Sequence, residues 1–154
     1  MINSIFVFEA TGTDPHYNIA TEKYLLDNIQ KGQCILYLWQ NKNTVVIGRN
    51  QNAWAECRTT LLEDEGGKLA RRLSGGGAVF HDLGNLNFSF LAAGENYDLE
   101  KQLSVITEAC ALVGISAQVS GRNNISWEDK FRYDLQYINS GITLWGDIKI
   151  IFET

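Results

Sequence analysis

The sequence predicts an α+β fold in a single domain. Short apolar segments that alternate with the period of two expected for β-strands are interspersed with segments that carry helical signals. The 154 residues are 45% hydrophobic and 20% charged, which is ordinary globular usage and enough to bury one core. No repeat or low-complexity tract interrupts the pattern, so we expect residues 1–154 to form one domain without a linker.

The first predicted elements are a short strand and a helix. Residues 5–8 form an apolar run of β-forming side chains. Asp14 and Pro15 then supply the N-cap and the first residue of a helix, because an aspartate accepts free backbone N–H groups and proline needs no hydrogen bond there. We expect this helix to run to about Lys31.

Two strands and a second helix are expected next. Residues 34–39 and 44–47 are predicted strands, and the polar segment 40–43 between them predicts a hairpin turn. Residues from about 53 to 65 are predicted to be helical, and the glycine pair at 66–67 is expected to end that helix.

Two further predicted strands flank a run of three glycines at residues 75–77. Residues 68–72 lead into the sheet before the glycines, and the segment after them alternates between apolar and polar side chains. The apolar side chains are Leu86, Phe88 and Phe90, and the polar ones between them are Asn87 and Ser89. We expect one face of this strand to join the core and the polar face to line a pocket.

The last predicted helix follows from an apolar stripe at intervals of four and three residues. The stripe consists of Leu99, Leu103, Ile106, Cys110 and Val113. Gly114 comes directly after the stripe and is expected to end the helix. A stripe of this kind predicts a core-facing helix and not a cofactor site.

Charge and cysteine content argue against several classes of protein. The net charge is -5 and no cluster of Lys and Arg is longer than a pair, which argues against a nucleic-acid partner. The three cysteines lack Cys-x-x-Cys spacing, so neither a zinc site nor a disulfide framework is indicated, and Cys34 and Cys110 are predicted core thiols. We expect a cytoplasmic protein without a membrane partner, because no signal-like segment and no apolar run of about 18 residues occurs.

The most informative segment is residues 71–90, where two arginines and three glycines precede an apolar strand. Exposed backbone N–H groups in such a loop bind phosphate or carboxylate oxygens, and Arg71 or Arg72 could add a bidentate contact. A flexible hairpin tip with solvated arginines is the alternative, and the glycines alone do not decide between the two. The segment is neither a P-loop nor a dinucleotide fingerprint, because no Gly-Lys-Ser/Thr follows and a strand comes next.

The full run of residues 71–90 resembles the signature of the lipoate–protein ligase family, within the larger group of biotin and lipoate ligases and transferases. Residues 44–52, with Trp54 and Glu56 after them, and residues 120–123 resemble that family's other motifs in the expected order. The resemblance covers about residues 1–125. It implies a mixed, largely antiparallel sheet flanked by helices, similar to the biotin/lipoate ligase catalytic domain.

The resemblance also implies a two-step reaction. A lipoate carboxylate attacks the α-phosphate of ATP to give lipoyl-adenylate and pyrophosphate, and a lysine amine of an acceptor domain then attacks the mixed anhydride. ATP, magnesium and lipoate are therefore expected ligands. The expected partner is the lipoyl acceptor domain of a 2-oxoacid dehydrogenase or of a glycine-cleavage protein. Such chemistry needs positive charge and backbone donors around phosphate oxygens, and an apolar slot for the lipoyl chain.

Residues are assigned to this chemistry by the same resemblance. The nucleotide and the adenylate phosphate would be held by Arg72, Ser74, Gly75, Gly76, Gly77, Ala78, Val79, Phe80, Asn87 and Asn123. Lys130 matches the catalytic lysine that contacts both lipoate and nucleotide, and an ordinary strand-edge lysine is the alternative. Trp39 is expected to line the apolar slot, and His81 to make a structural hydrogen bond without transferring a proton.

The chain departs from the family pattern after about residue 125. Asn124 replaces the family's aspartate, and Arg132 and Tyr133 stand where Ser-Gly is expected. The family's later strands and its accessory C-terminal domain are expected to be absent, and a naturally minimal protein, a fragment or a segment read out of frame would each account for this. Two alternative functions stay open: a transferase of octanoyl or lipoyl groups that does not use ATP, and a non-catalytic relative that binds the acceptor domain or a lipoyl ligand.

Overall fold

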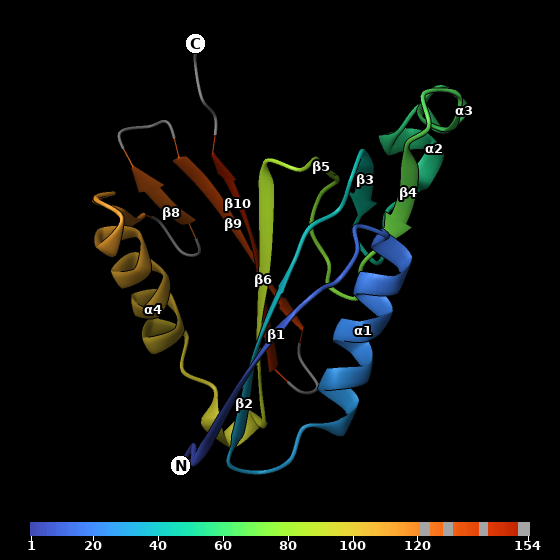
Figure 1. Ribbon diagram of the computed structural model, residues 1–154. Helices are drawn as coiled ribbons and strands as arrows, with labels where there is room; N and C mark the ends of the chain where they lie inside the picture. The colour runs from blue at the N-terminus through green and yellow to red at the C-terminus, as the bar shows by residue number, and fades with distance from the viewer. Residues whose placement is uncertain (121–123, 128–130, 139–141, 151–154) are drawn as a thin grey trace.

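The computed structural model describes residues 1–120, 124–127, 131–138 and 142–150, which form two β-sheets with helices packed against them (Figure 1). The strands are β1 (Ser4–Glu9), β2 (Gln33–Trp39), β3 (Thr44–Ile47), β4 (Lys68–Arg71), β5 (Val79–His81), β6 (Asn85–Ala92), β7 (Gln118–Ser120), β8 (Asn124–Trp127), β9 (Phe131–Ile138) and β10 (Ile142–Ile150). The helices are α1 (Pro15–Asn28), α2 (Ala53–Glu56), α3 (Thr59–Asp64), the 3-10 helix η1 (Gly94–Asn96) and α4 (Leu99–Leu112).

The larger sheet has the strand order β1-β2-β6-β10-β9-β8-β7. Its β1 and β2 are parallel, and the neighbouring pairs from β2 to β7 are antiparallel in the described residues. The smaller sheet has the order β4-β3-β5, with β4 parallel and β5 antiparallel to β3. The predicted α+β class with a mixed, largely antiparallel sheet is therefore confirmed.

The hydrophobic core lies on both faces of the larger sheet. On one face Phe88 and Phe90 of β6 pack with Leu103 and Ile106 of α4. On the other face Tyr37 and Trp39 of β2 pack with Ile19 of α1 and with Val46 and Ala70 of the smaller sheet. Figure 1 shows α1 beside the smaller sheet and α4 on the opposite side of the larger sheet. Helix α1 therefore packs against both sheets, on the face of the larger sheet that carries Tyr37 and Trp39.

Helix α1 begins as predicted. One carboxylate oxygen of Asp14 accepts hydrogen bonds from the His16 and Tyr17 N–H groups at 2.9 and 3.0 Å, and Pro15 is the first helical residue. The helix ends at Asn28, before the predicted Lys31, and Ile29 is extended. A turn that follows the helix then leads the chain into β2.

The apolar stripe of α4 is only partly a core stripe. Leu103, Ile106 and Cys110 are buried as predicted, and Gly114 ends the helix with a φ of +83°. Val113, by contrast, is 73% exposed, because it is the C-cap residue and no longer follows the helical direction. The core thiols at Cys34 and Cys110 are confirmed, and burial raises the pKa of both.

The predicted hairpin between residues 34–39 and 44–47 is wrong. β2 belongs to the larger sheet and β3 to the smaller one, so residues 40–43 carry the chain from one sheet to the other. The physical reason is Asn41. Its side chain is fully buried and bonds to Asn18 of α1 and to His81 of β5, whereas the side chain of a hairpin-turn residue would be solvated. A polar segment between two strands looks the same in sequence in either case.

Two smaller expectations also need correction. The helix expected over residues 53–65 is two short helices, α2 and α3, because Cys57 is in an extended conformation between them. On β6, Leu86 is 38% exposed, whereas Asn85, Asn87 and Ser89 on the polar face are buried. The polar face is buried because α1 and the smaller sheet cover it. None of the described helices is long and apolar enough to cross a membrane.

Candidate functional site

The loop that contains the three glycines lies against the loop that follows β3. The Arg49 N–H donates to the Ser74 carbonyl at 2.8 Å, and a Cβ atom on Gly48 would lie 2.2 Å from the Gly76 carbonyl oxygen. Gly76 has a φ of +90°, which L side chains rarely adopt. Gly48 and Gly76 are therefore required by this packing, whereas a Cβ on either of the other two glycines would meet nothing within 4 Å.

Arg72 holds the glycine loop from inside. Its side chain is buried, with 3% exposed, and its guanidinium donates to the Val46 carbonyl at 3.1 Å. The same guanidinium donates to the Gly75 carbonyl at 2.9 and 3.2 Å and to the Gly77 carbonyl at 2.6 Å. These contacts fix the carbonyls of the loop, so Arg72 has a structural function that the sequence did not indicate. Its predicted contact with phosphate stays a prediction.

Arg71 does the same for the loop after β3. Its guanidinium donates to the carbonyls of Gly48, Arg49 and Gln51 at 3.0, 3.1 and 2.7 Å. The two consecutive arginines therefore reach into two different loops, because successive side chains on a strand point to opposite faces. Each arginine stabilises one half of the loop pair.

The N–H groups of residues 75–77 have no acceptor within the described part of the chain. The three glycines are exposed, and their carbonyls at 75 and 77 face Arg72. Consecutive N–H groups around a left-handed residue form a concave donor site that suits phosphate or carboxylate oxygens. The geometry thus fits the anion-binding interpretation better than that of a solvated hairpin tip.

Asn87 is the other predicted site residue with unused hydrogen-bonding groups. It lies on β6 opposite Trp39 of β2, and its side chain is fully buried. Within the described residues, neither its amide nitrogen nor its amide oxygen has a hydrogen-bond partner, and the amide oxygen of the neighbouring Asn85 also lacks one. A buried polar atom without a partner is costly and indicates a bound ligand or an ordered water.

Trp39 is buried between aromatic neighbours. Its ring stacks on Tyr37 with centroids 6.2 Å apart and meets His81 edge-on at 6.1 Å. It also lines a cavity of about 330 Å³ that is bounded by residues 9–13 and by Leu86, a size within the range of small-molecule sites. The glycine loop does not line this cavity in the described residues, so the predicted slot and the predicted phosphate site are separate features here.

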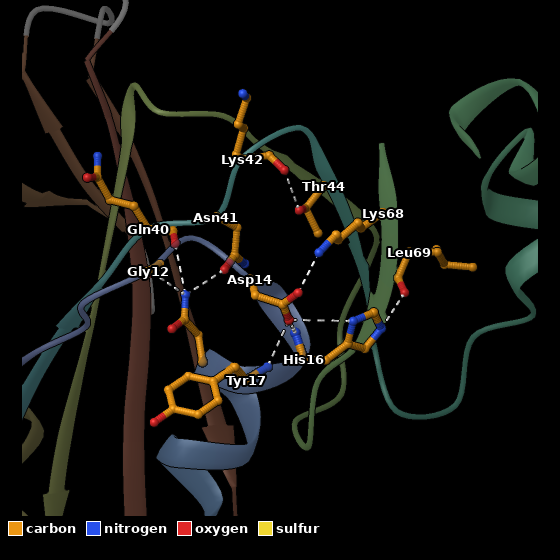
Figure 2. A network of polar contacts seen from close by, with 11 residues as sticks. Gly12, Asp14, His16, Tyr17, Gln40, Asn41, Lys42, Thr44, Lys68 and Leu69 are labelled. Carbon is orange, nitrogen blue, oxygen red and sulfur yellow. Dashed lines mark hydrogen bonds and ion pairs between the residues drawn. The ribbon is translucent and has the colours of Figure 1, made fainter. Parts of the chain in front are cut away.

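A buried asparagine network joins α1 to both sheets. The Asn18 amide nitrogen donates to the Gln40 carbonyl at 2.9 Å and to the Asn41 side-chain oxygen at 3.1 Å, as drawn in Figure 2. The Asn41 amide nitrogen lies 3.0 Å from His81 Nδ1, and the Tyr37 hydroxyl donates to Asn18. We call Asn18, Asn41, Tyr37 and His81 the asparagine network. The predicted structural hydrogen bond of His81 is confirmed, whereas the roles of Asn18 and Asn41 were not predicted.

The start of α1 is also tied to β4. Asp14 forms an ion pair with Lys68, and His16 Nε2 lies 3.1 Å from the Leu69 carbonyl oxygen (Figure 2). The Lys68 ammonium, followed by the Tyr17 N–H, lowers the pKa of Asp14 to about 2. This exposed group anchors the helix that covers the space between the two sheets.

Two predicted site residues, Asn123 and Lys130, lie outside the described residues, as do the other residues of 121–123 and 128–130. Ser74 is buried, Ala78 and Val79 are half-buried, and Phe80 is exposed. The structure thus brings the glycine loop and Arg72 together. Within the described ranges, no group of three or more acidic, histidine or cysteine side chains is placed to hold a metal ion.

Comparison with known sequences gives a consistent result. The family model of the lipoyl protein ligase A/B catalytic domain matches residues 14–132. A lipoate-protein ligase A of Blochmanniella pennsylvanica is 54% identical over 112 residues, which cover 73% of this chain and 33% of the relative. A lipoate-protein ligase A of Bdellovibrio bacteriovorus is 48% identical over 119 residues, covering 77% and 35%. The chain spans about a third of the length of the curated relatives it matches.

Solved structures share the fold. LipL1 of P. falciparum in complex with lipoate has a TM-score of 0.81 at 27% identity, over 99% of this chain and 49% of that chain. A bipartite lipoate protein ligase of Thermoplasma acidophilum, described with its E2 lipoyl domain, has a TM-score of 0.82 at 24% identity, over 100% and 63%. A lipoate-protein ligase A bound with ATP has a TM-score of 0.77 at 24% identity, over 100% and 68%.

The two likenesses at 24% identity establish the fold alone. The family match covers most of the chain and includes both loops of the candidate site. The chain therefore belongs to the lipoyl protein ligase A/B catalytic domain family.

Proposed function

We propose that this chain is the catalytic part of a cytoplasmic lipoate–protein ligase, with residues 1–154 acting as one catalytic domain. In the proposed reaction the lipoate carboxylate attacks the α-phosphate of ATP and pyrophosphate leaves, after which a lysine amine of an acceptor lipoyl domain attacks the activated carbonyl and AMP leaves. The observation that carries the proposal is the exposed glycine loop, whose N–H groups at residues 75–77 have no acceptor in the described part of the chain.

The glycine loop would bind the phosphate oxygens. Its N–H groups are held in position by Arg72 and by the packing of Gly48 on Gly76, so they need little rearrangement when negative charge develops. The Arg72 guanidinium adds a permanent positive charge behind the loop. Ser74, Ala78, Val79, Phe80 and Asn123 are proposed to complete the nucleotide site.

Asn87 would bind a polar group of the ligand, because its buried amide offers an unused donor and an unused acceptor. Lys130 is proposed as the catalytic residue: its ammonium would neutralise the carboxylate during attack and the phosphate charge afterwards. Magnesium usually binds through the phosphates of ATP with few protein ligands, which is compatible with the lack of an acidic cluster among the described residues.

The names of the similar proteins support this proposal. Curated relatives at 54% and 48% identity are lipoate-protein ligases A, and the similar structures include one in complex with lipoate and one bound with ATP. The proposed acceptor is the lipoyl domain of a 2-oxoacid dehydrogenase or of a glycine-cleavage protein. A lipoyl domain is named together with the T. acidophilum ligase.

The test is the intact mass of a purified acceptor lipoyl domain after incubation with this chain, lipoate, ATP and magnesium. We expect an increase by one lipoyl group that requires ATP and is lost with Lys130→Ala. Release of pyrophosphate, measured without acceptor, reports the first step alone. An increase that needs no ATP but does need an octanoyl or lipoyl donor would identify a transferase, and binding of lipoate without turnover would identify a non-catalytic relative.

A further inference from the structure

Strand β1 leaves an apolar edge of the larger sheet uncovered. It is the first strand in the sheet order, so among the described residues no strand lies beyond it. Its four central residues are all apolar and exposed: Ile5 is 71% exposed, Phe6 42%, Val7 60% and Phe8 46%. An edge strand offers a row of backbone N–H and C=O groups to another strand. Natural proteins protect such edges with lysine, proline or a bulge, and β1 contains none of these.

The opposite edge of the larger sheet is built differently. β7 is the last strand in the described order and has three residues, of which Gln118 and Ser120 are polar. A short edge strand gives a second chain few groups to pair with. Of the two edges described, β1 is therefore the one that suits pairing with another chain, and symmetric pairing through a single edge stops at two copies.

Both faces of β1 are apolar as well. Ile5 and Val7 line a groove of about 670 Å³ together with residues of α4. Phe6 and Phe8 point to the other face, because successive side chains of a strand alternate. The apolar residues among positions 1–8 expose roughly 600 Å², and each partner in a standard interface contributes about 800 Å². The strand and its flanking residues thus offer an area of the order that a stable dimer needs.

A two-fold axis limits how two copies of β1 can pair. Directly opposite residues of an antiparallel pair share a face, so the axis must pass beside a residue that pairs with itself. Phe6 and Val7 are the two positions that place five residues of β1 opposite each other. Pairing about Val7 would set Glu9 against Ile5. Pairing about Phe6 instead sets Ile5 against Val7 and leaves Glu9 outside the five paired residues.

We propose that this chain forms a symmetric dimer in which the β1 strands of two copies pair antiparallel about Phe6, so that the two larger sheets become one continuous sheet. The partner is a second copy because the surface is self-complementary: Phe6 faces Phe6, Ile5 faces Val7, and the two Glu9 carboxylates lie about 20 Å apart along the strands. None of the residues assigned to the ligase reaction takes part, so the dimer does not depend on the proposed function.

The first measurement is sedimentation velocity of the 154-residue chain between about 1 and 200 µM. We expect an equilibrium between monomer and dimer. Phe6→Lys should raise the dissociation constant of the dimer at least about tenfold, because it places two ammonium groups opposite each other at the axis. Leu112→Lys is the matched control, because Leu112 is 89% exposed but lies outside β1, and it should change that constant less than about twofold.

Circular dichroism establishes that both lysine variants are folded. A wild-type chain that stays monomeric at about 200 µM would overturn the proposal. Oligomers larger than a dimer would also overturn it, because a single edge closes at two copies. Equal dimerisation of Phe6→Lys and the wild type would show that β1 is not the interface.

The second measurement determines the register by disulfide formation in oxidised glutathione. A Cys57→Ser background removes the half-buried cysteine and leaves Cys34 and Cys110 in the core. Opposite residues of antiparallel strands have Cα atoms about 4.5 to 5.5 Å apart, within disulfide range, whereas diagonal neighbours are about 7 to 8 Å apart. We expect Phe6→Cys to form a covalent dimer at least about tenfold faster than Val7→Cys. Equal rates, or a faster rate for Val7→Cys, would overturn pairing about Phe6.

Discussion

The glycine loop and the asparagine network use polar groups in opposite ways. In the loop, the N–H groups of residues 75–77 are exposed and have no acceptor in the described residues. In the network, Asn18 and Asn41 are fully buried, and their amides bond to each other and to neighbouring groups. Satisfied buried groups stabilise one arrangement, whereas unsatisfied groups on a rigid loop are available to a ligand. The comparison therefore separates the part that holds the fold from the part proposed to bind substrate.

The sharpest test of the loop is Gly48→Ala. The new Cβ would lie 2.2 Å from the Gly76 carbonyl oxygen, so the two loops must separate. We expect a loss of about 4 kcal/mol in the free energy of unfolding and no measurable adenylate formation. Urea denaturation and pyrophosphate release are the measurements. Gly75→Ala is the matched control, because its Cβ would meet nothing within 4 Å, and it should change stability by less than about 1 kcal/mol. Equal losses in the free energy of unfolding for Gly48→Ala and Gly75→Ala would show that the loops are not packed as described.

Arg72→Ala should have the next largest effect. The substitution leaves the carbonyls of Val46, Gly75 and Gly77 without their donor. We expect a loss of about 3 kcal/mol in stability together with the loss of adenylate formation. Because Arg72 holds the loop, activity and stability should fall together, and this is measured by thermal unfolding beside pyrophosphate release. Lost activity at unchanged stability would instead mean that Arg72 acts on the ligand alone.

The sequence reveals the loop more readily than the network, for a physical reason. The loop is encoded by adjacent residues, so a run of arginines and glycines is visible as a pattern. The network is encoded by Asn18, Asn41, Tyr37 and His81, which come together only when α1 closes over both sheets. Composition and spacing do not report such contacts, so the polar segment around Asn41 has the sequence pattern of a hairpin turn.

The same distinction applies to the individual site residues. The α+β class, the cap at Asp14 and the end of α4 at Gly114 follow from local chemistry and were predictable. The need for Gly48 was not, because it depends on the loop at Gly76, which is distant in sequence. The proposed phosphate contact of Arg72 stays a prediction, and its bonds to the loop carbonyls depend on a buried geometry that no local pattern encodes.

A buried carboxyl beside the asparagine network should make stability depend on pH, which the neutral amides of the network do not. Substitution of Glu22 tests this difference. The pKa of Glu22 is about 7 in the folded chain and near 4.5 when unfolded, so between these values the folded state binds more protons. Stability should therefore fall as pH rises from about 4.5 through 7, by an amount on the order of 2 to 3 kcal/mol. Glu22→Gln, which does not titrate, should lack this decrease in urea denaturation at pH 4.5 and 8. An identical pH dependence in both proteins would exclude Glu22 as its source, and Glu108→Gln controls for an exposed glutamate.

The smallest expected effect concerns Asp14, which joins α1 to β4 at the surface. The Lys68 ammonium and the Tyr17 N–H lower its pKa to about 2, so its contribution is present above the unfolded pKa of 3.8 and is lost as pH falls toward 2. Asp14→Asn keeps an N-cap but removes the ion pair, whereas Asp14→Ala removes both. Because exposed ion pairs contribute little, we expect Asp14→Asn to change the melting temperature at pH 7 only slightly and Asp14→Ala to lower it by a few degrees. Equal losses in the two variants would assign the anchoring of α1 to the Lys68 ion pair, and the cap would then carry none of it.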